Sequence, residues 1–426
     1  MTRPGPALLF LRDARFRCLG SGGCCTRYDV QQGDTEPWTA LRARRDARGG
    51  EIVAVVASPV TGRPRLQLRT DPPGRCVLLR DDGLCDVHAV EGVGEKPDLC
   101  RLFPYETIDT PDGVVVSTVM ECDSYHRTFR DGMPVHLDAT AVSEVTARAG
   151  ALARVGARVA VVATPSAGTP AGPTVAWADY RRLEDSMLQR FGGPGALVPA
   201  ALAGLREAAC ALERAAETGA APAAPTAPAA PAAVDPVTVA LHAANHARRR
   251  RPDDQGARDA AAQALADLAL RVRALPREPV PWMSDLLDRV DGALTLAAAR
   301  AAGRLPAAAV EPRVARLLAV PPLHPFDAEP LASYYRDVFR QWLWSKQLAL
   351  EGVVAGAFAL TLRWALVATL AAAFAAERDA PAVEPADANA AVVRTSVFFR
   401  TQPAIVATAR STLDSTWRTT DVLLSA

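Results

Sequence analysis

The distribution of cysteines constrains this chain more than any other feature of its sequence. Only Cys210 lies in the long remainder of the chain, and the other seven cysteines are close together: Cys18, Cys24, Cys25, Cys76, Cys85, Cys100 and Cys122. An odd number of clustered cysteines argues against a disulfide framework and favours metal ligation. Thiolates are soft ligands that select zinc, copper(I) or iron–sulfur clusters over magnesium or calcium. The sequence therefore predicts that these seven cysteines bind an iron–sulfur cluster, with a [4Fe–4S] cluster favoured, or zinc.

The residues around the first cysteines favour loops that wrap closely around an ion. The segment 20–23 has the sequence Gly-Ser-Gly-Gly and directly precedes the pair Cys24–Cys25. Glycine tolerates the positive φ angles that such a loop requires. The Asp-Gly step at 82–83 favours a hairpin, which would bring Cys76 and Cys85 together.

The later cysteines also have stiff or extended neighbours. Pro97 and Pro104 restrict the backbone on both sides of Cys100. A strand-like run at 114–120 leads to Cys122. We expect short strands and turns to draw these ligand-bearing loops to one centre.

The number of cysteines leaves the ligand set open. A structural zinc site needs four Cys or His ligands, and one iron–sulfur cluster usually needs four cysteines. Either some cysteines support the ligands, or two centres exist and His88 or His126 supplies an eighth ligand. The alternative is that these are buried, inert thiols that pack as small hydrophobic groups.

Four blocks of sequence resemble a known family. They are Phe-Arg-Cys at 16–18 followed by Cys-Cys at 24–25, Gly-Leu-Cys-Asp-Val-His at 83–88, Cys-Arg-Leu-Phe-Pro at 100–104, and Cys122. Their order is similar to the cysteine-cluster family described as a putative zinc- or iron-chelating domain, which includes the flagellin lysine-N-methylases. The cysteine part covers about residues 10–130, and the aromatic run 334–342 is similar to the helical region of the methylase-like members.

The resemblance implies an activity and a second cofactor. The flagellin enzymes transfer a methyl group from S-adenosylmethionine to protein lysines and carry an iron–sulfur cluster, so a protein substrate that carries lysines would be a partner. Lysine methylation requires a neutral amine, and a nearby carboxylate or tyrosine would help to remove its proton. The candidates beside the cysteine blocks are Tyr105, Glu106, Glu121 and Asp123, each of which is more often an ordinary loop or capping residue. No Rossmann-type glycine-rich turn follows a strand outside the cysteine loop, so the sequence assigns neither catalytic residues nor an S-adenosylmethionine site.

Two other functions fit the same cysteines. One is a non-catalytic zinc- or iron-chelating or carrier protein whose helical region binds a partner. The other is an electron-transfer module, which needs a cluster with an accessible redox couple. Binding of S-adenosylmethionine would distinguish the methylase from the carrier.

Composition and charge narrow the class of protein. The chain of 426 residues is 49% hydrophobic and 22% charged, with a net charge of +1. This balance argues against a nucleic-acid binder. The short apolar run 6–11 is interrupted by charged residues, unlike a secretory signal, so we expect a cytoplasmic protein. In the most apolar stretch, 353–376, Arg363 and Trp364 leave two runs too short to span a membrane, and we predict a buried core helix.

The sequence predicts an α+β chain, with a small cysteine-rich metal-binding domain that has short strands and a larger all-helical region. The expected divisions are a metal-binding domain at 1–135, a helical segment at 136–220, an Ala/Pro-rich linker at 221–236 and an all-helical domain at 237–426. Short strands are expected at 51–56 and 65–68. Helices are expected at 139–162, 177–191, 198–216, 237–250, 256–274, 280–300, 306–318, 328–350, 351–378, 387–399 and 403–424.

Helical periodicity also singles out candidates in the second part of the chain. Tyr335, Val338, Phe339 and Trp342 share one helix face, which favours core packing over a substrate groove. The remaining polar candidates have ordinary structural explanations: they are His242 and His246, the arginines at 248–251, and His324.

Overall fold

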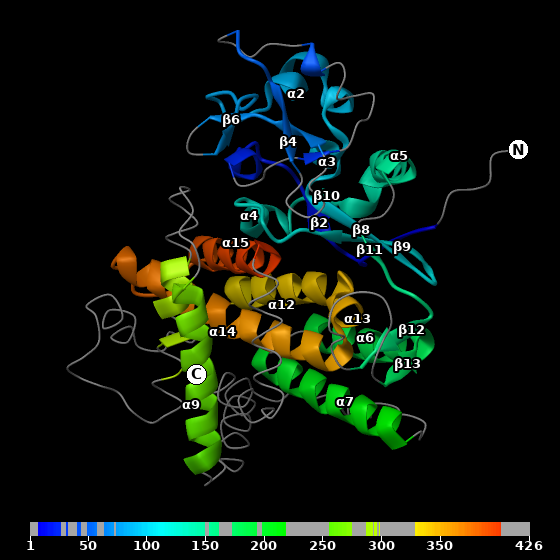
Figure 1. Ribbon diagram of the computed structural model, residues 1–426, viewed down its shortest axis with the longest axis vertical. Coiled ribbons are helices and arrows are strands. Elements are labelled where there is room, and N and C mark those ends of the chain that lie inside the picture. Colours follow the sequence, from blue (N-terminus) through cyan, green and yellow to red (C-terminus); the bar gives the residue numbers. More distant parts are fainter. Residues whose placement is uncertain are drawn as a thin grey trace, which may run out of the picture. The chain divides into compact units, whose positions relative to one another are not determined.

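The chain forms two compact units in a computed structural model (Figure 1). The first comprises Met1–Thr107, Gly113–Ala153 and Arg277–Ser284, and the second comprises Ile108–Asp112, Arg154–Pro276 and Asp285–Ala426. The structure describes residues 7–26, 31–32, 41–43, 49–57, 64–71, 74–149, 153–161, 173–193, 198–218, 255–274, 287–292, 294–295, 298 and 329–401. The expected linker at 221–236, the expected helices at 237–250, 306–318 and 403–424, and the candidates at 242, 246, 248–251 and 324 lie outside these residues.

The first unit consists of short strands and short helices. Its strands are β1 (Leu8–Phe10), β2 (Arg15–Phe16), β3 (Gln31–Gln32), β4 (Val53–Ala57), β5 (Pro64–Leu68), β6 (Thr70–Asp71), β7 (Arg75–Cys76), β9 (Gly113–Thr118) and β10 (Met133–Pro134). The strands β8 (Tyr105–Thr110) and β11 (Ala153–Arg154) each have residues in both units. The helices of the first unit are η1 (Gly23–Thr26), α2 (Asp86–Glu91), η2 (Val93–Glu95), α3 (Asp98–Leu102), α4 (Tyr125–Thr128), η3 (Val135–Asp138) and α5 (Ala139–Ala149). The expected strands at 51–56, 65–68 and 114–120 are therefore confirmed, with small shifts at their ends.

Small antiparallel sheets frame the cysteine segments. The three-stranded sheet has the order β3-β5-β4, with Val53 opposite Leu68 and Val55 opposite Leu66. Val53, Leu66 and Leu68 lie on one face of this sheet and are buried, whereas Val55, two residues further along the same face, is exposed. A four-stranded sheet has the order β1-β9-β8-β11, and β1 runs parallel to β9.

The second unit is mainly helical. Its helices are α6 (Trp177–Gly192), α7 (Val198–Thr218), α9 (Gln255–Arg273), α12 (Glu329–Trp344), α13 (Gln347–Glu351), α14 (Val353–Glu377) and α15 (Pro385–Thr401), and residues 287–292 are helical as well. It also contains the antiparallel pair β12 (Arg158–Ala160) and β13 (Thr174–Ala176). The chain is thus a mixed helical and stranded protein with a helical C-terminal part, as expected in outline, but the region after residue 135 is not all-helical.

The expected helix at 139–162 is wrong in its second half. The helix α5 ends at Ala149, and β11 and β12 follow within the expected range. Val159 and Val161 are buried, and Val159 lies opposite Val175 of β13. The β-branched valines therefore take part in a sheet, and tertiary pairing overrides the helical periodicity of the alanine-rich sequence.

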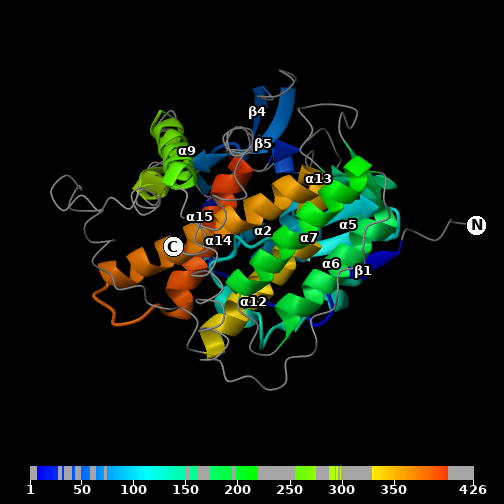
Figure 2. The same ribbon diagram turned by 90° about the horizontal axis from the view of Figure 1, so that it is seen from below.

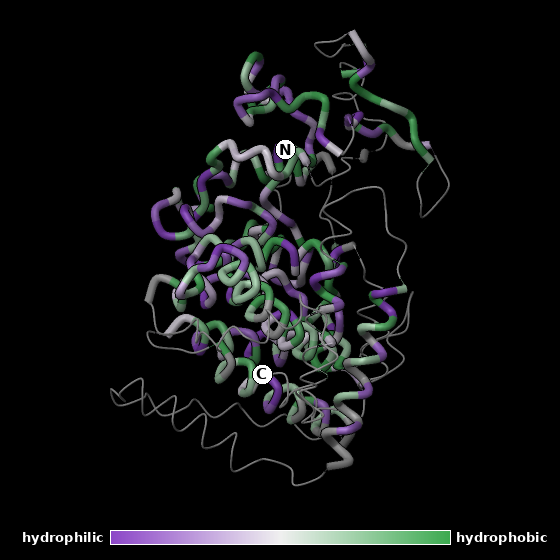
Figure 3. The backbone as a smooth tube through the Cα atoms, turned by 90° about the vertical axis from the view of Figure 1, so that its left-hand side faces the viewer, coloured by the Kyte–Doolittle hydropathy of each residue, from purple (hydrophilic) through white to green (hydrophobic). Residues whose placement is uncertain are grey.

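The long apolar helix α14 lies in the middle of the helical unit. It packs against α15, α7 and α13, and Figure 2 shows α14 running beside α7 and α15. In Figure 3 the packed helices carry long hydrophobic stretches. By length and composition α14 is the one described helix that could cross a membrane, yet 88% of its most apolar window is buried. The prediction of a buried core helix is confirmed.

Arg363 lies inside this core without breaking the helix. Its guanidinium stands 5.0 Å from the ring centre of Trp342 and 4.5 Å from that of Phe399. Aromatic faces carry partial negative charge, so these two rings stabilise a cation that is only 5% exposed. The charge that divides the apolar sequence is thus accommodated in the core.

The aromatic stripe of α12 also belongs to the core, as the periodicity predicted. Tyr335, Val338 and Phe339 are fully buried. The Phe339 ring contacts Trp342 at 4.9 Å and Trp364 at 5.7 Å between ring centres. These contacts join α12 to α14 and leave the stripe no open face.

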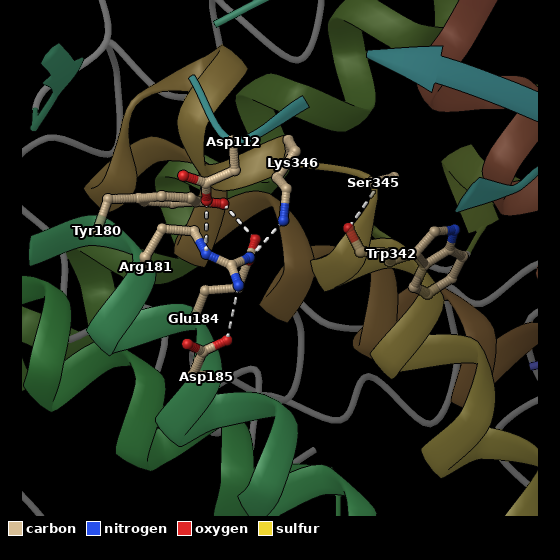
Figure 4. Close-up of polar contacts among 8 residues, drawn as sticks. All are labelled: Asp112, Tyr180, Arg181, Glu184, Asp185, Trp342, Ser345 and Lys346. Atoms are coloured by element: carbon tan, nitrogen blue, oxygen red, sulfur yellow. Dashed lines mark hydrogen bonds and ion pairs between the residues drawn. The ribbon is translucent and has the colours of Figure 1, made fainter. Parts of the chain in front are cut away.

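The expected helix at 328–350 is interrupted at Lys346, which has a left-handed backbone with φ +60°. The side chain of Lys346 is completely buried and donates a hydrogen bond to Glu184 of α6 (Figure 4). Glu184 also accepts from the Tyr180 hydroxyl at 2.7 Å and from Arg181 at 2.5 Å. Burial lowers the pKa of Lys346, and the Glu184 carboxylate opposes that shift.

Arg181 extends this network towards the surface. Its guanidinium lies 3.2 Å from Asp185 and 3.5 Å from Asp112 (Figure 4). Glu184 therefore accepts from three donors, whereas in the described part of the chain the Lys346 ammonium donates to Glu184 alone. The ring of Trp344, 4.1 Å from the Lys346 amine, adds a cation–π contact.

We expect Glu184→Leu to destabilise the protein by about 3–5 kcal/mol, because it leaves the buried ammonium of Lys346 unpaired. Lys346→Met should cost clearly less, because Glu184 keeps Arg181 and Tyr180. Urea unfolding followed by circular dichroism measures both, with Asp185→Asn as the control. Asp185 is half exposed, so its loss should change the free energy of unfolding by no more than about 0.5 kcal/mol. An equal or larger loss in Lys346→Met would contradict this account.

Candidate functional site

The first two cysteines of the central group lie on a short turn of helix. The helix η1 contains Cys24 and Cys25, and it begins after Gly20 and Gly22, which have φ values of +66° and +70°. The backbone N–H of Cys25 donates to Gly22 at 2.9 Å. The two Sγ atoms lie 3.9 Å apart and share a hydrogen bond. The glycine loop therefore turns both thiols to one place, as the sequence predicted.

The turn before Cys85 packs directly on this glycine loop. Gly83 has φ +82°, and a Cβ atom built on it would lie 2.4 Å from the Gly20 carbonyl oxygen. The turn is closed by the Gly83 N–H, which donates to Arg80 at 3.1 Å. Only glycine fits this contact, which holds the segment before Cys85 against the segment before Cys24.

The pairing across this turn differs from the expectation. Cys85 forms an isolated β-bridge with Leu79, and Cys76 pairs with Thr70 of β6 instead. The hairpin is thus shorter than predicted, because its turn closes tightly between Arg80 and Leu84. Cys76 and Cys85 still come into one neighbourhood, since the chain folds back between them.

Four cysteines from separate segments pack on one apolar cluster. Cys76 is a buried member of it, and Cys25, Cys85 and Cys100 are partly buried against it. The cluster is formed by Leu41, Ile52, Val53, Leu66, Leu68, Leu78 and Val87. The structure therefore brings Cys25, Cys76, Cys85 and Cys100 together, with Cys24 beside Cys25.

These thiols lie close enough to one another to affect each other's pKa values. Burial raises the pKa of Cys76 to about 11 and that of Cys100 to about 12, and the charges of the neighbouring thiols add to both shifts. The hydrogen bond with Cys24 is the largest cause that raises the pKa of Cys25, and the same bond lowers the pKa of Cys24 to about 7. Several thiolates at once are therefore unfavourable here unless a cation balances their charge.

Lys96 is a basic residue near these thiols that the cysteine motifs did not indicate as part of the site. The charge of its ammonium contributes to the lowered pKa of Cys24 and opposes the rise in the pKa values of Cys76 and Cys100. It caps the end of η2, where its backbone N–H donates to Val93 at 3.3 Å. The sequence feature that distinguishes Lys96 is the rarity of lysine, because Lys96 and Lys346 are the only lysines among 48 basic residues.

Cys18 and Cys122 lie at the edge of this group. Cys18 is exposed and its Sγ accepts the Gly20 N–H at 3.4 Å. Burial raises the pKa of Cys122 to about 11, and the charges of Cys18 and Cys24 contribute to that shift. These two cysteines approach each other and Cys24, but they do not belong to the apolar cluster of the other four. Cys210 belongs to α7 of the second unit.

The two candidate histidines have different surroundings. His88 is exposed on α2, and His126 is half-buried on α4, four residues after Cys122. Burial lowers the pKa of His126, and its Nδ1 atom has no hydrogen-bond partner in the described part of the chain. Burial therefore favours the neutral form of His126, which is the form that a metal ligand must have.

The four candidate bases differ in their burial, and Tyr105 is held by a hydrogen bond. The Tyr105 hydroxyl donates to Asp138, and burial raises the pKa of Tyr105 well above its usual value. Glu121 is buried, whereas Glu106 and Asp123 are half-buried.

The clustered cysteines are the right type of ligand for a soft metal, but their present arrangement is not that of a ready metal site. Within the described ranges no three side chains of His, Cys, Asp or Glu form a ready metal-binding group. The described cysteines are all free thiols, and those that pack together offer the sulfur donors that zinc and iron–sulfur clusters require. Bringing their sulfur atoms to bonding distance would require local adjustment of loops that are already adjacent.

Comparison of the chain with known protein families, curated proteins and solved structures found no match. The resemblance to the cysteine-cluster family therefore stays a prediction from the cysteine blocks themselves.

We expect Gly83→Ala to destabilise the first unit by at least about 1 kcal/mol, because a side chain at positive φ is strained and its Cβ meets the Gly20 carbonyl oxygen. Thermal unfolding, with hydrogen exchange of residues 74–100, measures the effect. Gly94→Ala is the matched control, since no atom lies within 4 Å of the added Cβ. Equal behaviour of the two variants would show that the contact between loop and turn does not hold the thiol segments together.

Proposed function

We propose that the first unit binds a soft metal centre, either an iron–sulfur cluster or zinc, through its clustered cysteines. The observation that carries the proposal is the packing of Cys25, Cys76, Cys85 and Cys100 on one apolar cluster, although they come from four separate segments. These four are the primary ligands that we propose. Cys24 lies beside them, and Cys18 and Cys122 complete the edge of the site.

The physical argument is one of donor type and number. Four sulfur donors match the requirement of a structural zinc site or of one iron–sulfur cluster. The centre would cross-link the short strands and turns of this unit, and its binding free energy would contribute directly to folding. If the thiols were only small hydrophobic groups, replacement of one by serine would cost a modest amount of stability and no metal would be lost.

Elemental analysis and a visible spectrum of protein purified without oxygen test this function. Iron with acid-labile sulfide and a brown colour would support the cluster, and one or two colourless zinc ions would support a structural zinc site. We expect Cys100→Ser and Cys85→Ser to lose the metal and to melt at lower temperature. Cys210→Ser is the control and should keep both properties. If Cys100→Ser keeps its metal and melts normally, the proposed ligand set is wrong at that position.

The enzymatic part of the proposal rests on the resemblance of the cysteine blocks to the flagellin lysine-N-methylases. It would make the protein a methyltransferase that uses S-adenosylmethionine and acts on a protein lysine. The alternative is a zinc- or iron-chelating carrier whose helical unit binds a partner. Both share the metal site, so the metal experiment does not separate them.

Calorimetric titration with S-adenosylmethionine separates the two functions. If the protein is a methylase, we expect saturable binding to the metal-loaded protein and transfer of a labelled methyl group to lysines of a protein substrate. No binding, together with movement of the metal to a chelating acceptor, would support the carrier and overturn the methylase.

A further inference from the structure

Exposed apolar residues gather around the proposed metal site. Among the described residues, nine large hydrophobic side chains are exposed, and four of them are Leu19, Leu84, Val90 and Val93. Val90 is 68% exposed and Val93 is 52% exposed. Single exposed hydrophobic residues are common, but a local group of them marks an interaction surface. Leu19 follows Cys18 and Leu84 precedes Cys85, so the group borders two of the proposed site residues.

The four side chains belong to one small region of the first unit. A Cβ atom at Gly20 would lie 3.0 Å from a methyl carbon of Leu84, so the loop that carries Leu19 touches Leu84. Val90 lies on α2, a helix of six residues that extends about 9 Å at 1.5 Å per residue, and Val93 begins the short helix η2 that follows. The backbone N–H of Gly92 then donates to His88 at 3.2 Å, which keeps the segment before Val93 against the helix.

The charges of the same segment specify the partner. Residues 81–95 contain five acidic residues, Asp81, Asp82, Asp86, Glu91 and Glu95, and no Lys or Arg, although the whole chain has a net charge of +1. All five acidic residues are exposed. Arg75 neutralises Asp81 at 3.1 Å and Arg80 neutralises Asp82 at 3.0 Å. Within the described ranges Asp86 and Glu95 have no basic partner, so the face keeps negative charge.

We propose that this docking face, formed by Leu19, Leu84, Val90 and Val93 with the acidic residues of 81–95, binds a basic protein segment that carries both lysine or arginine and apolar side chains. An apolar centre with a charged rim is the usual anatomy of a protein interface. The negative charge attracts a basic chain and repels nucleic acid and anionic lipid surfaces. The inference deepens the proposed function, on which it rests, because it names the class of protein that reaches the metal-binding unit.

Fluorescence anisotropy of labelled peptides on the full chain tests the proposal. The probe is a 12-residue peptide in which lysines and valines are mixed. One control peptide has glutamate in place of lysine, and a second has serine in place of valine. We expect the lysine–valine peptide to bind most tightly and to weaken as salt is raised. Absence of binding, or equal binding of the glutamate peptide, would overturn the proposal.

Two pairs of substitutions locate the binding. Val90→Ser with Val93→Ser should weaken binding by about tenfold, because the apolar contacts are lost. Val55→Ser is the matched control, because Val55 is 61% exposed on β4, outside the docking face. Asp86→Asn with Glu95→Gln should also weaken binding and reduce its salt dependence. Unchanged binding in the first pair, or an equal loss in Val55→Ser, would refute the location.

The metal content of every sample is measured at the same time. If the substituted proteins keep their metal and bind the peptide as the wild type does, the docking proposal fails and the metal proposal stands. If the wild type contains no metal but the peptides follow the expected order, the docking face is supported and the metal proposal fails.

Discussion

The first unit depends on drawing thiols that are far apart in the sequence to one place. Cys25 and Cys100 are separated by most of the unit, yet both pack on the apolar cluster that contains Cys76. The strands that frame them are two to six residues long, so hydrogen bonding within the sheets alone gives little stability. The glycine contact between Gly20 and Gly83 closes the arrangement where a side chain could not fit. A metal centre would be the natural cross-link for such a unit, because its binding free energy adds to that of a small core.

The helical unit, by contrast, has to accommodate charged side chains inside an apolar core. Arg363 is stabilised by the faces of two aromatic rings. Lys346 and Arg181 both donate to the Oε2 atom of Glu184, and the Tyr180 hydroxyl donates to its Oε1 atom. Burying an ion pair gives little net stability, but a half-broken pair is costly, so such a network favours one arrangement of the helices over its alternatives. The left-handed backbone at Lys346 separates α12 from α13, so the paired lysine stands at the break between the two helices.

The sequence predicted the elements whose signal is local. The helices α6, α7, α9, α14 and α15 follow the expected ranges closely, because amphipathic or continuous apolar periods fix them. The clustering of Cys25, Cys76, Cys85 and Cys100 was predicted from composition and turn residues. The strand register around these cysteines was not predicted correctly. Cys85 bridges Leu79, and the pairing of two-residue strands is set by tertiary contacts. The strands at 153–161 were missed for the same reason, because β11 lies beside β8 of an earlier segment and β12 pairs with β13 further along the chain. The paired role of Glu184 has no sequence signal at all, since its partner is 162 residues away.

The two lysines show how composition and structure together can identify a constrained position. All but two of the 48 basic residues are arginine, so a lysine in this chain is an exception to a strong bias. A guanidinium is broad, planar and always charged, whereas an ammonium is compact and concentrates its charge on one atom. Lys346 occupies a fully buried position between Glu184 and Trp344, where the smaller group can be accommodated. Lys96 acts on three thiols of the proposed metal site, where a compact positive charge offsets the repulsion between neighbouring sulfur atoms. The two lysines of this arginine-rich chain thus stand at positions with different constraints: Lys346 is fully buried in an ion pair, and Lys96 is a half-buried cation that acts on neighbouring thiols.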